Sequence, residues 1–167
     1  MSDLRFSSLR AARDDDAQDL YGLVALCFAE FPGCYLDPHD DMPDLRRPAS
    51  AAAEKGGHLW VVEDERGRVC ACVAVDEPSP GTAELHRLYV RPDQRRRGLG
   101  ERLVRLVEDH ARDVSAARVV FWSDTRFTDA HRLYERLGYV RGGTRPLGDV
   151  SNSIEYFFAK DLVSPER

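Results

Sequence analysis

Apolar and polar residues recur along the chain with two periods, which predict where helices and strands lie. From Leu20 to Phe28 the apolar residues have helical spacing. An acidic run at 14–16 favours the start of this helix, and the Phe-Pro-Gly sequence at 31–33 favours its end. Further helices are predicted over 50–55, over 99–114, and between Thr128 as N-cap and Gly138 as the residue after the last turn. Strands are predicted over 4–10, 58–63, 68–75, 82–91, 118–123, 139–142 and 154–160.

The resulting order, β-α-α-β-β-β-α-β-α-β-β, predicts one α/β domain with a mixed, twisted sheet flanked by helices. The domain is expected to span residues 1–167, with its core at about 5–162. A chain of 167 residues is long enough for a single domain with a sizeable core. Its composition, 43% hydrophobic and 32% charged, is ordinary for a soluble globular protein.

The overall charge of the chain argues against a nucleic-acid partner. The formal net charge is −5, which does not favour non-specific binding to a phosphate backbone. The run Arg95–Arg97 is a local exception, and it is explained either by a phosphate-binding turn or by a solvated turn.

The sequence also gives expectations for location and for metal binding. No apolar run approaches the roughly 20 residues that span a bilayer, and the first five residues lack the apolar region of a signal peptide. We therefore expect a cytoplasmic protein with no membrane partner. The pair Cys70-x-Cys72 lacks zinc-site spacing, so we expect no metal. On a regular strand both thiols would point to the same face as small core residues.

The stretch 88–100, Leu-Tyr-Val-Arg-Pro-Asp-Gln-Arg-Arg-Arg-Gly-Leu-Gly, predicts a binding site for pyrophosphate. It reads as a strand that stops at Pro92, a basic turn with two glycines, and then a helix. Glycines let successive N–H groups point into one hollow, and the start of a helix adds unpaired N–H groups and a positive dipole end. The stretch has no lysine for a Walker loop. The third glycine of a dinucleotide fingerprint is also missing, because Leu103 stands at its position.

Three motifs resemble the GCN5-related N-acetyltransferase (GNAT) superfamily. Arg95-x-x-Gly98-x-Gly100 resembles its coenzyme A loop, the segment 84–92 resembles its fourth strand, and the segment 130–139 resembles its Leu-Tyr-x-x-x-Gly-Phe/Tyr signature. The resemblance implies the GNAT fold and acetyl-CoA as co-substrate. It also implies backbone N–H groups of the fourth strand that hold the thioester oxygen. The implied cofactor-binding residues are Leu88, Tyr89, Val90, Arg95, Arg96, Arg97, Gly98, Leu99, Gly100 and Glu101.

The same resemblance implies roles in catalysis. Tyr134 stands where the family has a tyrosine that protonates the leaving coenzyme sulfur. Glu84 stands where the histone-acetylating branch has its general base. His86 is the second candidate base, because an imidazole gains and loses protons nearer to neutral pH than a carboxylate does. Water alone is the third. Phe127 departs from the family, which often has an asparagine that contacts the coenzyme there, so Thr128 or Arg132 makes this contact or it is absent.

The resemblance also implies that the acceptor binds between the loop that joins the first two helices and the last two strands. That loop is acidic and aromatic, which suits a cationic amine, although a solvated acidic loop has the same composition. Its candidate residues are Phe31, Tyr35, Asp37, His39, Asp40, Asp41, Met42 and Asp44. The polar segment 141–153 is a candidate to close over the acceptor, and Arg126 and Arg145 are candidates to bind a carboxylate.

These observations predict an acetyl-CoA-dependent N-acetyltransferase that acts on a primary amine of a small molecule, by direct attack in a ternary complex. The alternatives are a protein or peptide N-acetyltransferase and a coenzyme A-binding sensor without turnover. The resemblance also allows a homodimer. The sequence does not identify the acceptor amine.

Overall fold

The structure, a computed structural model, describes residues 8–37 and 42–162. Within this part of the chain, no helix combines the length and the apolar character that a bilayer crossing requires. The elements are β1 (Leu9–Ala11), η1 (Asp14–Asp16), α1 (Ala17–Phe28), η2 (Pro43–Arg46), α2 (Pro48–Glu54), β2 (His58–Glu63), β3 (Val69–Ser79), β4 (Thr82–Val90), η3 (Pro92–Gln94), α3 (Leu99–Asp113), β5 (Arg118–Asp124), α4 (Thr128–Arg136), β6 (Val140–Pro146) and β7 (Ile154–Asp161).

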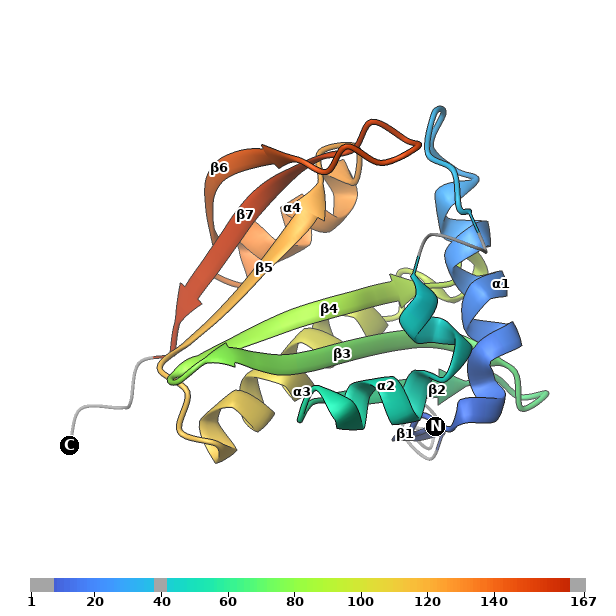
Figure 1. Ribbon diagram of the computed structural model, residues 1–167, viewed down its shortest axis with the longest axis horizontal. Helices are drawn as coiled ribbons and strands as arrows, with labels where there is room; N and C mark the ends of the chain where they lie inside the picture. The colour runs from blue at the N-terminus through green and yellow to red at the C-terminus, as the bar shows by residue number, and fades with distance from the viewer. Residues whose placement is uncertain (1–7, 38–41, 163–167) are drawn as a thin grey trace.

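The strands form one seven-stranded sheet in the order β1-β2-β3-β4-β5-β7-β6. The pair β4–β5 is parallel and all the other pairs are antiparallel. This mixed sheet with flanking helices confirms the predicted fold class. The strands β4 and β5 pair only from Thr82 to Glu84 with Arg118 to Val120, and they diverge beyond that point (Figure 1).

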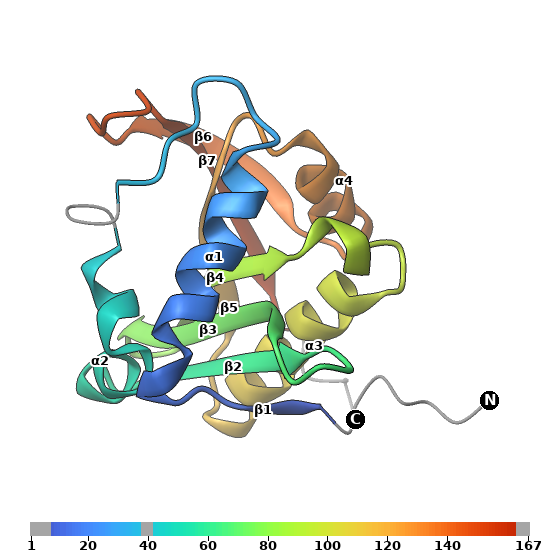
Figure 2. The same cartoon turned by 90° about the vertical axis from the view of Figure 1, so that its right-hand side faces the viewer.

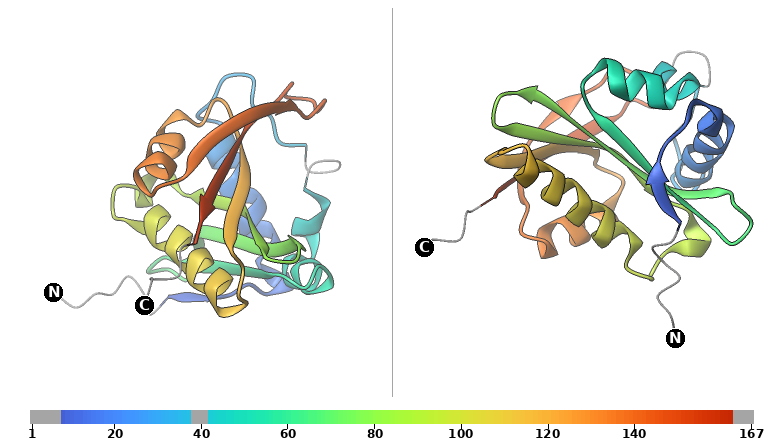
Figure 3. Two further views of the ribbon diagram at one scale, coloured as in Figure 1. Left: turned by 90° about the vertical axis from the view of Figure 1, so that its left-hand side faces the viewer. Right: turned by 90° about the horizontal axis from the view of Figure 1, so that it is seen from below.

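The helices cover both faces of the sheet. Helix α1 lies across one face, with α2 at its end (Figure 2), and α3 lies on the opposite face (Figure 3, right). The apolar residues that predicted α1 and α3 are the ones that pack. Leu20, Leu23 and Val24 join Val61 and Cys72 in one buried cluster. Leu103, Val104 and Val107 join Val73, Phe121 and Phe158 in the other, which also includes Tyr134 of α4.

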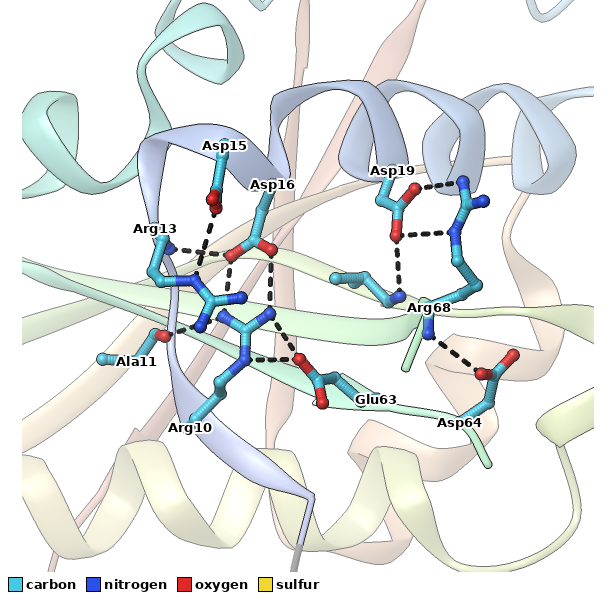
Figure 4. Close-up of polar contacts among 10 residues, drawn as sticks. Arg10, Ala11, Arg13, Asp15, Asp16, Asp19, Glu63, Asp64 and Arg68 are labelled. Carbon is cyan, nitrogen blue, oxygen red and sulfur yellow. Dashed lines mark hydrogen bonds and ion pairs between the residues drawn. The ribbon is translucent and has the colours of Figure 1, made fainter. Parts of the chain in front are cut away.

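Ion pairs join the start of α1 to the strands beneath it (Figure 4). Arg10 of β1 donates to both carboxylate oxygens of Asp16 at 2.8 Å and contacts Glu63 of β2 at 2.6 Å. The hydrogen bond from Arg10 holds the pKa of Asp16 below its usual range. Asp19 likewise accepts from Arg68 and from the backbone N–H of Val69. The acidic run that predicted a helix start therefore also anchors α1 to the sheet.

The prediction that Cys70 and Cys72 share a face is wrong. Cys70 packs in the cluster on the α3 side and Cys72 in the cluster on the α1 side. The pairing of β2 with β3 shifts register between Val62 and Glu63, opposite this position. A bulge of this kind inserts one extra residue and reverses the alternation of side chains beyond it.

Several element boundaries also differ from the prediction. Residue 128 is the first residue of α4, so Phe127 and not Thr128 occupies the N-cap position. Strand β3 continues to Ser79 and β6 continues to Pro146, four residues beyond the expected strand end in each case. Much of the segment expected to close over the acceptor is therefore strand. The predicted strand at 4–10 is described only from residue 8 onward, where β1 begins at Leu9.

A buried carboxylate joins α3 to the end of the sheet. Glu108 has no exposed side-chain surface. It accepts hydrogen bonds from Lys160 of β7 at 2.9 Å, Tyr139 at 3.1 Å and Arg105 at 3.2 Å. A buried charge of this kind is stable only while its partners remain in place.

We expect Glu108→Ala to lower the free energy of unfolding by about 3 kcal/mol, because it leaves Lys160 and the Tyr139 hydroxyl without their buried acceptor. Asp109→Ala on the same helix is the matched control. Its carboxylate is 71% exposed and pairs with Arg112 at the surface, so its loss should cost less than about 0.5 kcal/mol. Urea denaturation followed by circular dichroism measures both changes, and equal effects would contradict the central role of Glu108.

Candidate active site

The divergence of β4 from β5 opens two adjoining cavities. One, of about 310 Å³, is lined by β4, by the end of β5 and by Tyr134 of α4. The other, of about 280 Å³, is lined by β3, β4 and α2 and includes Glu84 and His86. Both are bounded by Leu85, His86, Arg87 and Tyr89 of β4 and by Trp122 of β5. Two ligands, one in each cavity, can therefore come together at β4, where the side chains that line each cavity can act on them.

A bulge in β4 lies at this shared wall. His86 pairs with Ala74 and Tyr89 pairs with Cys72, so β4 has one residue more than β3 over this interval. Arg87, inside the bulge, has φ +56°, a conformation that costs a non-glycine residue about 1–3 kcal/mol.

Two contacts hold the bulge in place. The guanidinium of Arg87 donates to Asp44 of η2 at 2.7 Å. The thiol of Cys72 donates to the backbone carbonyl of Arg87 at 3.0 Å. Burial raises the pKa of Cys72 to about 12, so the thiol keeps its proton and remains a donor at neutral pH.

The turn and the helix after it lie where predicted, but only Gly98 belongs to the turn, because Gly100 is the second residue of α3. Arg96 and Gly98 have φ +61° and +78°, and α3 begins directly afterwards. The backbone N–H of Arg102 donates to the carbonyl of Gly98. The N–H groups of residues 99–101 therefore precede the first helical hydrogen bond, where a helix leaves its donors without intrahelical acceptors.

A side chain at position 100 would lie against α4. A Cβ built there would be 3.2 Å from Cδ2 of Leu133, which is tighter than an ordinary contact. Gly100 thus permits the close approach of α3 to α4. Helix packing alone therefore accounts for a glycine at this position, without reference to a ligand.

The three arginines of the turn do not behave alike. Arg95 turns back toward the end of α1, where it pairs with Glu30, two residues beyond the helix, at 2.6 Å. It also donates to the carbonyl of Val90 at 3.0 Å. Arg97 donates to Gln94 at 3.2 Å. The Arg95 side chain, predicted to bind the coenzyme, therefore already has protein partners in this structure.

Tyr134 lines the larger cavity from α4 and is 5% exposed. Burial raises the pKa of its phenol above the usual range, while a hydrogen bond with Ser123 of β5 acts in the opposite direction. Ser123 also lies 3.1 Å from Nε2 of His131, which is 2% exposed. The sequence analysis gave no role to His131. The sequence signal that could have found His131 was helical spacing. His131 precedes Tyr134 by three residues, so the two side chains lie on the same face of the helix.

Glu84 and His86 point to the same face of β4, as predicted, with Oε2 and Nε2 4.0 Å apart. Asp76 of β3 adds a third group, which the sequence analysis missed, at 3.2 Å from Nε2 of His86. Among the described residues, these three are the ones whose ligand atoms lie close enough to hold a metal ion, all within 4.8 Å of one another. The hydrogen bond between Asp76 and His86 accounts for part of this closeness without an ion.

The loop between α1 and α2 reaches across to the loop between β6 and β7. The hydroxyl of Ser151 accepts from the N–H of Tyr35 at 2.8 Å and lies 3.1 Å from its carbonyl oxygen. Asp44, predicted to contact the acceptor, is paired with Arg87. Three other candidates, His39, Asp40 and Asp41, lie outside the described residues.

The two arginines proposed for an acceptor carboxylate already have partners. Arg145 pairs with Glu155 at 2.8 Å and lies 4.2 Å above the ring of Trp122. Arg126 donates to the backbone carbonyl of Ser151. An acceptor carboxylate would have to displace the contacts of Arg145, whereas Nη1 of Arg126 is buried without a hydrogen-bond partner among the described residues.

Phe127 replaces the polar residue that is frequent in GNAT sequences with an aromatic one. Its ring centroid lies 4.9 Å from that of Phe31 and 6.2 Å from that of Phe28. Phe28 and Phe127 line the larger cavity near the start of α4, and Phe31 packs against Phe127.

Comparison with known proteins settles the family. Residues 18–139 match the family described as Acetyltransferase (GNAT) family, and this range contains β4, the glycine turn and Tyr134. The chain belongs to the GNAT acetyltransferase family. Enzymes of this family depend on acetyl-CoA.

Individual GNAT relatives agree with this. An uncharacterized N-acetyltransferase of Schizosaccharomyces pombe is 30% identical over 139 residues, which are 83% of each chain. The Xenopus tropicalis protein named Probable N-acetyltransferase 14 is 32% identical over 72% of this chain, and the match spans only 58% of the frog protein. A Salmonella typhimurium acetyltransferase structure with its cofactor acetyl-CoA has a TM-score of 0.71 at 19% identity and 96% coverage of both chains.

Proposed function

We propose that this GNAT protein transfers an acetyl group from acetyl-CoA to a primary amine of a small molecule, by direct attack in a ternary complex. The observation that carries the proposal is the pair of cavities that share the β4 wall. Tyr134, the candidate acid, lines one cavity and Glu84, the first candidate base, lines the other, while His86 lines both. Thioester and amine would thus meet at one strand while each remains within reach of its own proton-transfer group.

On the coenzyme side, we propose that backbone groups do most of the binding. The N–H groups of 99–101 and the positive end of α3 suit a pyrophosphate, and Gly98 lets the chain turn into the helix. The β4 backbone from Leu88 to Val90 lies beyond the last β5 pair at Glu84, so its β5-facing edge suits the pantetheine arm and the thioester oxygen. A preorganised N–H aimed at such an oxygen typically lowers the barrier by about 3 kcal/mol.

On the amine side, we propose that Glu84 takes the proton through a water molecule, with His86 as the second candidate base. Asp76 holds the His86 ring at 3.2 Å and so fixes its orientation. Tyr134 supplies a proton to the departing sulfur. Because burial raises the pKa of this phenol, it stays protonated and ready to donate at neutral pH.

A small acceptor suits this site better than an extended peptide. The contacts between Tyr35 and Ser151 join the two loops at the rim of the larger cavity, where an extended chain would need an open groove. These residues lie far apart in the sequence, so the connection is tertiary and not part of a local turn. Pairs of small amines test which kind of acceptor reacts.

We expect Gly98→Ala to weaken binding of acetyl-CoA by about tenfold or more in isothermal titration, because φ +78° is strained for alanine and the turn must shift. Gly67→Ala is the matched control. Gly67 has φ +75° and equally open surroundings, but it lies in the β2–β3 turn. Both variants should lose similar stability, and only Gly98→Ala should lose affinity. Equal affinity in the two variants would remove this turn from the coenzyme site.

We expect Tyr134→Phe to lower kcat about 100-fold while KM for acetyl-CoA changes little, because the variant keeps the ring and loses the proton donor. Release of free thiol measures turnover. Tyr139→Phe is the control, because Tyr139 lines neither cavity and its hydroxyl donates to Glu108 of α3. Wild-type turnover in Tyr134→Phe would exclude Tyr134 as the acid.

The charges of the smaller cavity predict which amines react. Its arginines, Arg87 and Arg145, are paired with Asp44 and Glu155. Asp76 and Glu84 instead face the imidazole of His86. Lys55 also lines the cavity and balances one of these two carboxylates, so one negative charge remains in excess. This arrangement favours a cationic acceptor and disfavours an acceptor that carries a carboxylate.

We therefore expect amines to react better than the corresponding amino acids. Cadaverine against lysine and tyramine against tyrosine are suitable pairs, and kcat/KM should differ by about tenfold or more, which corresponds to ~1.4 kcal/mol. A preference for the amino acids would contradict the assignment of charges. Acetyl-lysine on co-incubated proteins, found by mass spectrometry without turnover of any small amine, would instead favour a protein acceptor.

A further inference from the structure

His131 is a buried titratable residue to which the proposed reaction gives no role. It lies on α4 three residues before Tyr134 and is 2% exposed. Aromatic rings surround it, with the centroids of Tyr156 and Phe158 at 5.6 and 5.2 Å. Burial lowers its pKa, so the ring is neutral at pH 7. A polar group in such surroundings is costly unless its hydrogen bonds are made.

The contacts of His131 lead to the cavity. Its Nε2 lies 3.1 Å from Oγ of Ser123 on β5. The backbone of Asp124 acts on the ring in the direction that favours a bound proton. In the neutral form with that proton on Nδ1, Nε2 is an acceptor, and the hydroxyl of Ser123 donates to it. Ser123 also faces the phenol of Tyr134 and lowers its pKa, against the effect of burial.

The three side chains follow one another from the cavity wall inward, with the hydrogen bond between Ser123 and His131 as the inner link. Tyr134 and Ser123 both line the larger cavity, and His131 lies behind them. A serine hydroxyl rotates freely about its C–O bond, so it can turn from one acceptor to another without moving its oxygen. Ser123 has two acceptors within reach, Nε2 of His131 and the oxygen of Tyr134.

We propose that Ser123 stabilises the phenolate that Tyr134 becomes when it gives up its proton, and that His131 is a positioning residue that holds Ser123 beside the phenol. The inference rests on the proposed function. The phenol proton passes to the sulfur as the carbon–sulfur bond breaks, and the bond pair stays on sulfur. The Ser123 hydroxyl turns from His131 to the new phenolate. The phenol then regains a proton from solvent after the products leave.

The alternative is that Ser123 and His131 only satisfy one another inside the fold. A double-mutant cycle separates the two roles, because a residue that acts through the Tyr134 hydroxyl has nothing to act on once that hydroxyl is gone. A purely structural residue lowers activity by the same factor whether the hydroxyl is present or absent.

The experiment measures kcat and KM by thiol release for Ser123→Ala and His131→Leu, each alone and combined with Tyr134→Phe. We expect kcat to fall about tenfold for Ser123→Ala and about threefold for His131→Leu, with KM for acetyl-CoA unchanged. In the Tyr134→Phe background neither substitution should lower kcat further. Ser123→Thr, which keeps the hydroxyl, should recover most of the lost kcat.

Ser153→Ala is the matched control. Ser153 is a buried serine that lines the same cavity, but its hydroxyl bonds to Asp149 at 2.7 Å. Any effect of Ser153→Ala should be the same in both backgrounds. Equal losses from Ser123→Ala in the two backgrounds, or no loss in either, would overturn the positioning role and leave the acetyltransferase intact. Absence of thiol release by the wild-type protein with any amine would overturn the proposed function itself.

Discussion

The separation of β4 from β5 is the constraint on which the site depends. The two strands pair over three residues and then diverge, although both remain parts of one sheet. Parallel neighbours would ordinarily satisfy each other's backbone groups along their length. Here one edge of β4 lacks its neighbour, and the bulge at Arg87 falls on that same stretch. An interruption in the hydrogen bonding of the sheet thus leaves the strand edge to which we assign ligand binding.

The contacts that maintain this geometry come from outside the sheet. The pair Arg87–Asp44 and the thiol of Cys72 hold the bulge from the α1 side. On the opposite face, Glu108 ties α3 to β7, and the absence of a side chain at Gly100 lets α3 approach α4. The open side of β4 is therefore framed by packed elements on both faces, which is why a strained residue and an unpaired strand edge can persist there.

Periodicity predicted the fold class and nearly every element, because each helix or strand buries one face and so leaves a local pattern. The glycine turn and the shared face of Glu84 and His86 were predictable for the same local reason. Features that depend on residues far away in the sequence could not be predicted in this way. The extra residue opposite the Val62–Glu63 shift reverses the faces of Cys70 and Cys72 without leaving a mark in the alternation. The attachment of Arg95 to Glu30 spans 65 residues. Asp76 and Ser123 join the site only through strand pairing and helix packing.

The short β4–β5 pairing also links ligand binding to the stability of the whole molecule. The part of the sheet from β1 to β4 and the part formed by β5, β7 and β6 are joined directly by only three residue pairs. A ligand seated in the gap contacts both parts and binds only when they are correctly spaced. By mass action, a ligand present at 100 times its Kd adds about 2.7 kcal/mol to the free energy of unfolding. The cellular supply of such a ligand would thereby govern how long the folded protein survives proteolysis.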